Sequence, residues 1–211
     1  MGLRTYPKFD LDTMFLEIYN QSEKKVIGRI LQILGDYMLL ETSMLYEVYQ
    51  RRYGEKAELT KLKKAVRDFL VVQYKYNYGT EKEKPIFFYS LKRNGGDYIL
   101  KSGNYDFKIL PYFWTAQEHS NLLTFNSYFI QNEIENKELR LSALIAKGIY
   151  LTETTAYFLI DMITQEMVYS ELTKYENKDG EPLSSLVEYI SVETEPIDFG
   201  EFTSATEPKN A

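Results

Sequence analysis

The chain has 211 residues, and its hydrophobic content of 44% is enough for a globular protein with a core. It contains no cysteine, which excludes disulfides, thiolate zinc sites and thiol nucleophiles and fits a cytoplasmic location. The N-terminus lacks the apolar segment of a secretory signal, and no run approaches the ~18 apolar residues of a membrane helix. We therefore expect a cytoplasmic protein without a membrane segment.

The net charge of −6 conceals two regions of opposite sign. Residues 50–93 contain 12 Lys and Arg against 5 Asp and Glu, a net charge of +7. Residues 151–211 contain 3 against 13, a net charge of −10. A compact basic stretch in an acidic chain indicates a local anionic partner, although a solvated helix face with a charged hairpin tip would give the same count.

The predicted elements begin with an N-terminal arm and a short helix over residues 1–22. A stronger helix follows Ser22, its expected N-cap, because apolar residues then recur at helical spacing. Gly28 inside this helix suggests close packing of another element. A second helix ends at Gly54, which can take a positive φ. A third follows Thr60 and is expected to turn its apolar side chains inward, namely Leu62, Ala65, Val66, Phe69 and Leu70.

A two-stranded hairpin comes next. Residues 71–79 are rich in Val and Tyr and alternate as a strand does, and residues 86–91 return as the second strand. Lys82 and Lys84 lie at the turn between them. Helix, helix, basic helix and hairpin are the elements of a winged helix-turn-helix, which we predict over residues 23–103.

The third helix would then be the recognition helix, with one face in the core and its cations on the outer face. The residues expected to contact double-stranded DNA are Lys61, Lys63, Lys64 and Arg67 in the major groove, Arg51 and Arg52 at the phosphate backbone, and Lys82 and Lys84 on the wing.

Residues 104–192 are predicted to form a helical C-terminal region that pairs two copies in a homodimer. Its first helix is expected over residues 116–136. Residues 152–178 contain no Gly or Pro, which favours one long helix, but a buried strand at 156–163 followed by a helix is the alternative. The acidic residues 193–211 are predicted to form a disordered tail. The fold class is therefore α+β, mainly helical, with a winged helix-turn-helix domain followed by a helical region.

This order of elements resembles that of winged-helix proteins of Gram-positive plasmids and conjugative elements, and of the replication-relaxation family in particular. The resemblance lies in FFYSLKRNGGDYILKSG, a strand before a short Gly-containing helix, and in the helix-rich EHSNLLTFNSYFIQNEI. FLIDMITQEMVYSELTKYE is similar to the family's C-terminal part, with Asp161, Lys174 and Tyr175 at the matching places. The resemblance implies DNA binding in plasmid replication or transfer, and it implies no reaction.

Catalytic patterns are scarce. The single histidine, His119, has no neighbouring ligands and is expected to be structural. A nuclease would use Asp161, Glu171 and Lys174 around Mg²⁺, but on a helix the last two would form an i,i+3 ion pair. No glycine-rich phosphate loop is present. We expect no enzymatic activity and no cofactor. The predicted function is DNA binding in replication, transfer or transcription control, and the alternative is a winged-helix protein-interaction module that does not bind DNA.

Overall fold

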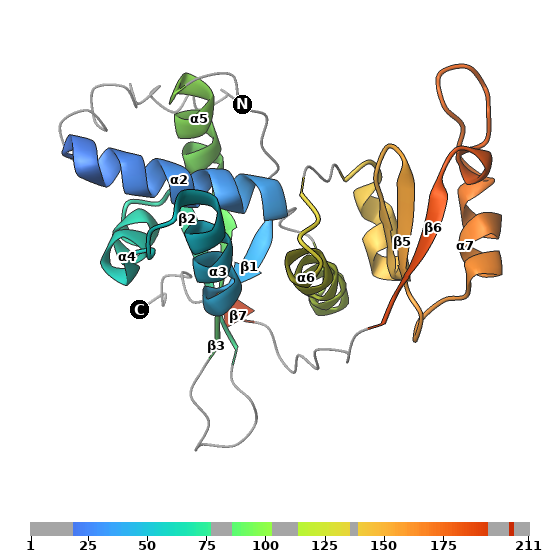
Figure 1. The fold of residues 1–211 in the computed structure, drawn as a ribbon, viewed down its shortest axis with the longest axis horizontal. Coiled ribbons are helices and arrows are strands. Elements are labelled where there is room, and N and C mark those ends of the chain that lie inside the picture. The colour runs from blue at the N-terminus through green and yellow to red at the C-terminus, as the bar shows by residue number, and fades with distance from the viewer. Residues whose placement is uncertain (1–18, 77–85, 103–113, 136–138, 194–202, 205–211) are drawn as a thin grey trace, which may run out of the picture.

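The computed structural model describes residues 19–76, 86–102, 114–135, 139–193 and 203–204. Residues 1–18 of the predicted arm and short helix (1–22), and the hairpin turn with Lys82 and Lys84, lie outside these ranges. The described chain is α+β, with more helix than strand. It has two small sheets on either side of a central helix (Figure 1).

In the N-terminal half, one helix precedes the first strand and two helices precede the second. Its elements are α2 (Gln21–Tyr37), β1 (Leu39–Glu41), α3 (Thr42–Tyr53), α4 (Leu59–Arg67), β2 (Val71–Tyr76), β3 (Ile86–Leu91) and α5 (Arg93–Ser102). Together with β7 (Thr203–Ser204), the strands form an antiparallel sheet in the order β1-β3-β2-β7, in which Val71 pairs with Leu91 and Leu39 with Ser90. The hairpin predicted from the alternation of residues 71–91 is confirmed in its two strands.

Helix α2 organises this half. It begins two residues before the predicted position, because Asn20 rather than Ser22 is its N-cap. The Asn20 side chain accepts the backbone N–H of Glu23 at 2.9 Å, and the Glu23 carboxylate accepts the N–H of Asn20 at 3.3 Å, which completes a capping box. Gly28 has no neighbouring atom within 4 Å of the place a Cβ would occupy. The prediction that Gly28 marks a close approach is therefore wrong.

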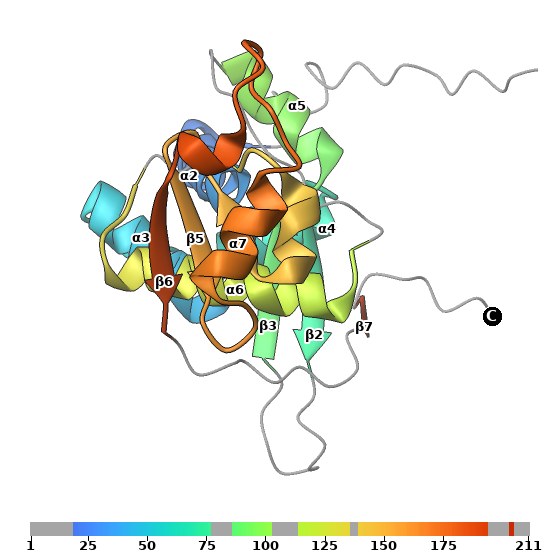
Figure 2. The same cartoon turned by 90° about the vertical axis from the view of Figure 1, so that its right-hand side faces the viewer.

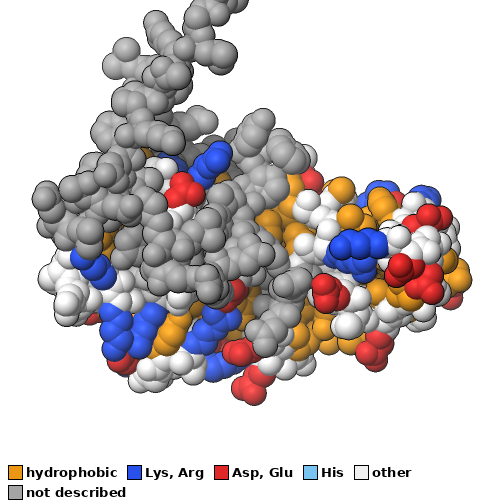
Figure 3. Space-filling view, turned by 90° about the horizontal axis from the view of Figure 1, so that it is seen from above, with side chains coloured by type: hydrophobic (Ala, Val, Ile, Leu, Met, Phe, Trp, Pro, Cys, Tyr) orange, Lys and Arg blue, Asp and Glu red, His pale blue; other side chains and the backbone are white. Residues whose placement is uncertain are grey.

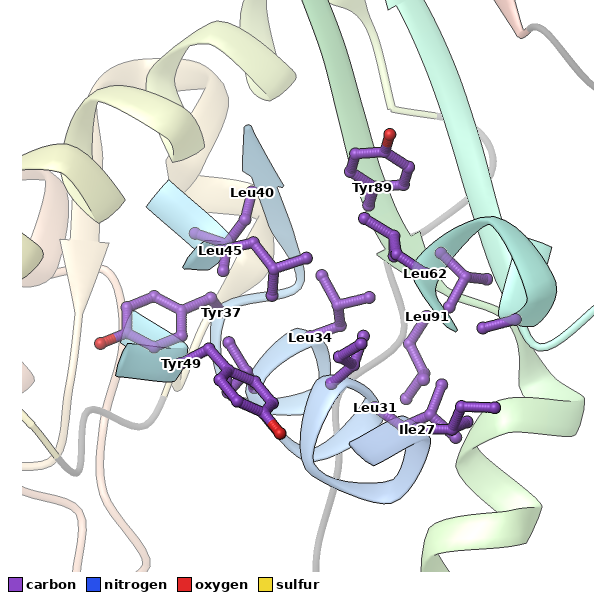
Figure 4. Packing of buried hydrophobic residues seen from close by; sticks show 14 of the residues in the cluster. Ile27, Leu31, Leu34, Tyr37, Leu40, Leu45, Tyr49, Leu62, Tyr89 and Leu91 are labelled. Atoms are coloured by element: carbon purple, nitrogen blue, oxygen red, sulfur yellow. The ribbon is translucent and has the colours of Figure 1, made fainter. Parts of the chain in front are cut away.

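The core of this half lies between α2, α3, α4 and one face of the sheet. Figure 4 shows side chains of α2 pointing toward those of β1, α3, α4 and β3. Leu31, Leu45 and Leu62 are completely buried, and Leu91 is nearly so. The opposite face of the sheet presents Leu39 and Phe88 to the central helix α6 (Ala116–Gln131), so the sheet is covered on both sides.

The C-terminal half is a three-stranded sheet with one helix. Its elements are the 3₁₀ helix η1 (Ser142–Lys147), β4 (Ile149–Leu151), β5 (Thr155–Leu159), α7 (Gln165–Leu172), η2 (Leu183–Ser185) and β6 (Glu188–Val192). Strand β5 is central, antiparallel to β4 and parallel to β6, and α7 forms the crossover between β5 and β6. Helix α7 covers one face of this sheet and α6 the other (Figure 2).

The predicted helical C-terminal region is therefore wrong beyond α6. Residues 155–159 form a strand, as in the alternative interpretation, and the helix after it is short. The physical reason is that every residue of β5 is buried. A strand covered on both faces reads as a continuous apolar run, which has no period of two to distinguish it from a buried helix.

The acidic tail also departs from the prediction at one place. Thr203 and Ser204 form β7, which pairs antiparallel with Lys75 and Tyr74 on the outer edge of β2. An edge strand exposes unpaired backbone N–H and C=O groups, and β7 covers this edge of β2 over Tyr74 and Lys75. None of the described helices is long and apolar enough to cross a membrane.

Candidate nucleic-acid interface

Helix α4 carries four of the predicted DNA-binding cations, and the structure divides them into two pairs. Leu62 and Ala65 are completely buried against the core. Lys61 and Lys64, on one flank, face the N-terminus of α2 and are only 22% and 19% exposed. Lys63 and Arg67 lie one turn apart on the outer stripe and are exposed. The prediction that all four cations occupy the outer face is therefore wrong for Lys61 and Lys64.

Glu23 is the reason for this division. Its carboxylate accepts the Lys64 ammonium at 2.9 Å and the Lys61 ammonium at 3.2 Å, while it also caps α2. The hydrogen bond from Lys64 is the main cause that lowers the pKa of Glu23 from 4.5 to about 2, and Lys61 acts in the same direction. The Lys64 ammonium also lies 4.6 Å from the ring centre of Tyr19, whose hydroxyl donates to Asp68. These contacts attach α4 to the start of α2.

Replacing this carboxylate should reveal its structural role. We expect Glu23→Gln to lower the free energy of unfolding at pH 7, because the amide loses both ion pairs. The folded pKa of Glu23 lies below the unfolded one, so its contribution is complete above pH 4.5 and is lost as the pH falls toward about 2. Urea unfolding at pH 7 and pH 3 should therefore show a smaller loss on acidification for the variant than for the natural protein. An equal loss would contradict this assignment.

Arg51 and Arg52, on α3, are also bound within the molecule. Arg51 donates to the carbonyl of Ile130 at 2.7 Å and pairs with Glu47 at 2.8 Å. Arg52 is half-buried, pairs with Asp36 and lies over the ring of Tyr37. A phosphate contact by Arg52 would require this ion pair to open, so its evident role is to hold α3 against the end of α2.

Lys63 and Arg67 are thus the predicted α4 cations that remain available. Lys63 has no ion pair with a described residue, and the Arg67 side chain is 72% exposed with only a long contact, 3.4 Å, to Asp68. Figure 3 shows Lys and Arg side chains in separate groups on the half formed by α2 to α5, with acidic side chains near them. The available positive surface is smaller than the net charge of the stretch implies.

The end of α4 contributes a feature that the sequence pattern did not predict. The N–H of Leu70 donates to the carbonyl of Ala65 at 2.9 Å, and that of Phe69 to Val66 at 3.1 Å. This is a Schellman motif, in which the residue after the C-cap takes a left-handed conformation. Here that residue is Phe69, with φ of 58°. Phe69 is consequently 62% exposed, and the prediction that it points inward is wrong. The Lys92 ammonium lies 5.0 Å from the centre of its ring.

Two of the three residues considered for a nuclease site, Glu171 and Lys174, form an ion pair. Glu171 on α7 is contacted by both Lys147 and Lys174, so the i,i+3 pair expected for a helical segment is confirmed. A groove of about 550 Å³ beside it is lined mainly by Met162, Ile163 and Met167 together with charged residues. Within the described residues, no three His, Asp or Glu side chains are grouped so that they could hold a metal ion.

Comparison with protein-family models finds no match, and no curated protein and no solved structure is similar enough to match this chain.

Proposed function

We propose that residues 19–102 form a winged helix-turn-helix that binds double-stranded DNA through the outer stripe of α4. The order helix, strand, helix, helix, strand, strand, with the sheet order β1-β3-β2, supports this proposal. It is the arrangement in which a third helix is presented beside a hairpin. The observation that carries the proposal is the exposure of Lys63 and Arg67 on the side of α4 that faces away from the core.

The proposed interface is narrower than the basic stretch. Phosphate contacts come from exposed cations that need not break an internal pair, which favours Lys63 and Arg67 over Lys61, Lys64 and Arg52. The wing lysines, Lys82 and Lys84, remain part of the proposal as sequence predictions. Such a module would act in replication, transfer or transcription control of a plasmid, mobile element or phage, in the cytoplasm and as a homodimer. Of these roles, the resemblance to replication-relaxation proteins implies DNA binding in plasmid replication or transfer.

The decisive variant is Lys63→Glu with Arg67→Glu. We expect its affinity for a mixed-sequence DNA duplex at low salt to fall by more than about tenfold, because two phosphate contacts become repulsive. The midpoint of thermal unfolding should stay within a few degrees, since both side chains are exposed. Lys64 is left unchanged because a carboxylate there would face Glu23 and destabilise α4.

A matched control separates local contacts from overall charge. Arg140→Glu with Lys178→Glu changes the net charge by the same amount, and both residues are exposed in the C-terminal half. This control should retain most of the affinity. An equal loss in the two double variants would show that binding is nonspecific attraction to the whole protein, and would contradict the interface on α4.

One observation favours the alternative, a protein-interaction module. Leu59 and Phe69 are 41% and 62% exposed at the two ends of α4, and large apolar side chains on a surface are common in protein contacts. Absence of duplex binding by the natural protein at low salt would favour this alternative. If binding is observed, selection of duplexes from a random pool tests symmetry, because an enriched palindrome indicates a dimer with two half-sites.

A further inference from the structure

Phe69 occupies a backbone position that suits glycine. At a Schellman end, the residue after the C-cap has a positive φ, and a side chain with a Cβ is strained there. A bulky aromatic residue with φ of 58° is a clear outlier among proteins. The same geometry follows α6, where Glu133 has φ of 55° and the N–H of Ile134 donates to the carbonyl of Phe129 at 2.9 Å. Among the described helices, α4 and α6 end in this way on a residue other than glycine, and only α4 carries an aromatic ring there.

Neither the core nor the backbone accounts for the ring. It is 62% exposed, so little of its surface is removed from water, and the turn itself would be better formed by glycine. Strained residues that folding does not require are characteristic of contact sites. A binding role is the remaining physical reason for an aromatic residue at this position.

The surroundings of the ring are cationic. Lys92 lies with its ammonium 5.0 Å from the ring centre, Arg67 is two residues before Phe69, and Arg93 is exposed at the start of α5. The nearest acidic side chain in sequence, Asp68, accepts the hydroxyl of Tyr19 and lies 3.4 Å from Arg67. Arg67 shares the outer stripe of α4 with Lys63, and Lys92 brings a further cation to the ring of Phe69.

We propose that Phe69 contacts DNA directly, by packing its ring on a base or sugar while the surrounding cations hold the phosphates. This inference rests on the proposed function and adds a non-ionic contact to it. An aromatic ring among cations matches a strand that presents flat bases beside phosphates, and stacking tolerates any base sequence. Phe69 would thus contribute affinity rather than sequence preference. An unpaired base and a duplex groove both offer this chemistry.

The test uses Phe69→Gly in the full chain, with thermal unfolding and DNA affinity measured on the same preparation. Removal of the left-handed strain should raise the unfolding midpoint, while the lost contact should weaken DNA binding by between about fivefold and a hundredfold. Phe69→Tyr should restore the affinity. A single strand and a duplex of the same sequence serve as the two probes. A larger loss of affinity for the single strand indicates that the ring meets an unpaired base, and a larger loss for the duplex indicates a groove.

Glu133→Gly is the matched control, because it relieves the same strain at the end of α6. It should raise the unfolding midpoint without reducing the affinity for either probe. If Phe69→Gly is more stable but binds both probes as the natural protein does, the inference is wrong while the proposed function stands. If the midpoint of thermal unfolding does not rise in Phe69→Gly, the backbone at Phe69 is not strained, and the inference is again wrong. If the natural protein binds neither probe, the proposed function fails, and this inference with it.

Discussion

Stability should fall by about 2 kcal/mol between pH 7 and pH 5 because of His119 alone. This imidazole lies on α6, only 6% exposed, with the rings of Tyr74 and Trp114 centred 5.8 and 6.3 Å away. Burial lowers the pKa of His119 from 6.5 to about 4, and the nearby carboxylate of Glu118 opposes that effect. The unfolded chain therefore takes up the proton first as the pH falls. The stability contributed by the neutral ring is complete above about pH 6.5 and is lost down to about pH 4.

Urea unfolding of the natural protein and of His119→Leu, each at pH 7 and pH 5, measures this contribution. The variant has no group to titrate at this position. Its free energy of unfolding should therefore fall by about 2 kcal/mol less than that of the natural protein between pH 7 and pH 5. The pKa of Glu23 lies well below this window, and its contribution should be the same in both proteins. Equal losses would mean that folding does not lower the pKa of His119.

The consequence of protonation extends beyond one residue because α6 connects the two halves. Phe125 and Phe129 on this helix pack against Tyr150 of the second sheet, while Asn126 donates to the carbonyls of Tyr37 and Leu39 at 2.8 Å each. A charge on His119 would loosen the helix against the first sheet. Hydrogen exchange at pH 5 should therefore be faster at the contact of α6 with β1 than at the contact of β5 with β6.

Helix positions and the core of the N-terminal half were predictable from spacing. Leu31, Leu34 and Leu62 follow the 3.6-residue repeat, and the structure buries each of them completely. Leu122 and Phe129 follow the same helical spacing in α6 and are also buried. These predictions succeed because one helix face against one core is a local pattern, which needs no knowledge of the rest of the chain.

The division of the α4 cations was not predictable in the same way. Lys61 and Lys64 are on a flank of the helix, and whether a flank is exposed depends on which element lies beside it. Glu23 is 38 residues before Lys61, and its carboxylate reaches both lysines only because α2 crosses α4. Helical spacing also does not predict the exposure of Phe69, because the residue that follows the last turn of a helix can point inward or outward.

Gly95→Ala should lower the stability of the protein by about 1–3 kcal/mol, through overpacking in the core. A Cβ built on Gly95 would lie 2.9 Å from a methyl carbon of Leu91 and 3.2 Å from the carbonyl carbon of Leu70, with the oxygen of that carbonyl closer still. Relief would have to come from backbone, because this oxygen also accepts the N–H of Lys92 at 2.9 Å. The shift would move α5 away from the start of β2, where Phe69 and Lys92 meet.

Gly28→Ala is the control for this substitution, because it places the same methyl group in a helix interior with nothing within 4 Å. It should stabilise the protein by about 0.5–1 kcal/mol, the ordinary preference of a helix for alanine over glycine. Denaturant unfolding of the two variants should give changes of opposite sign. A Gly95→Ala variant as stable as the natural protein would show that α5 can move at no cost. The Lys92 ammonium and the Phe69 ring would then be held together by α4 and β3 alone, rather than by the close approach of α5.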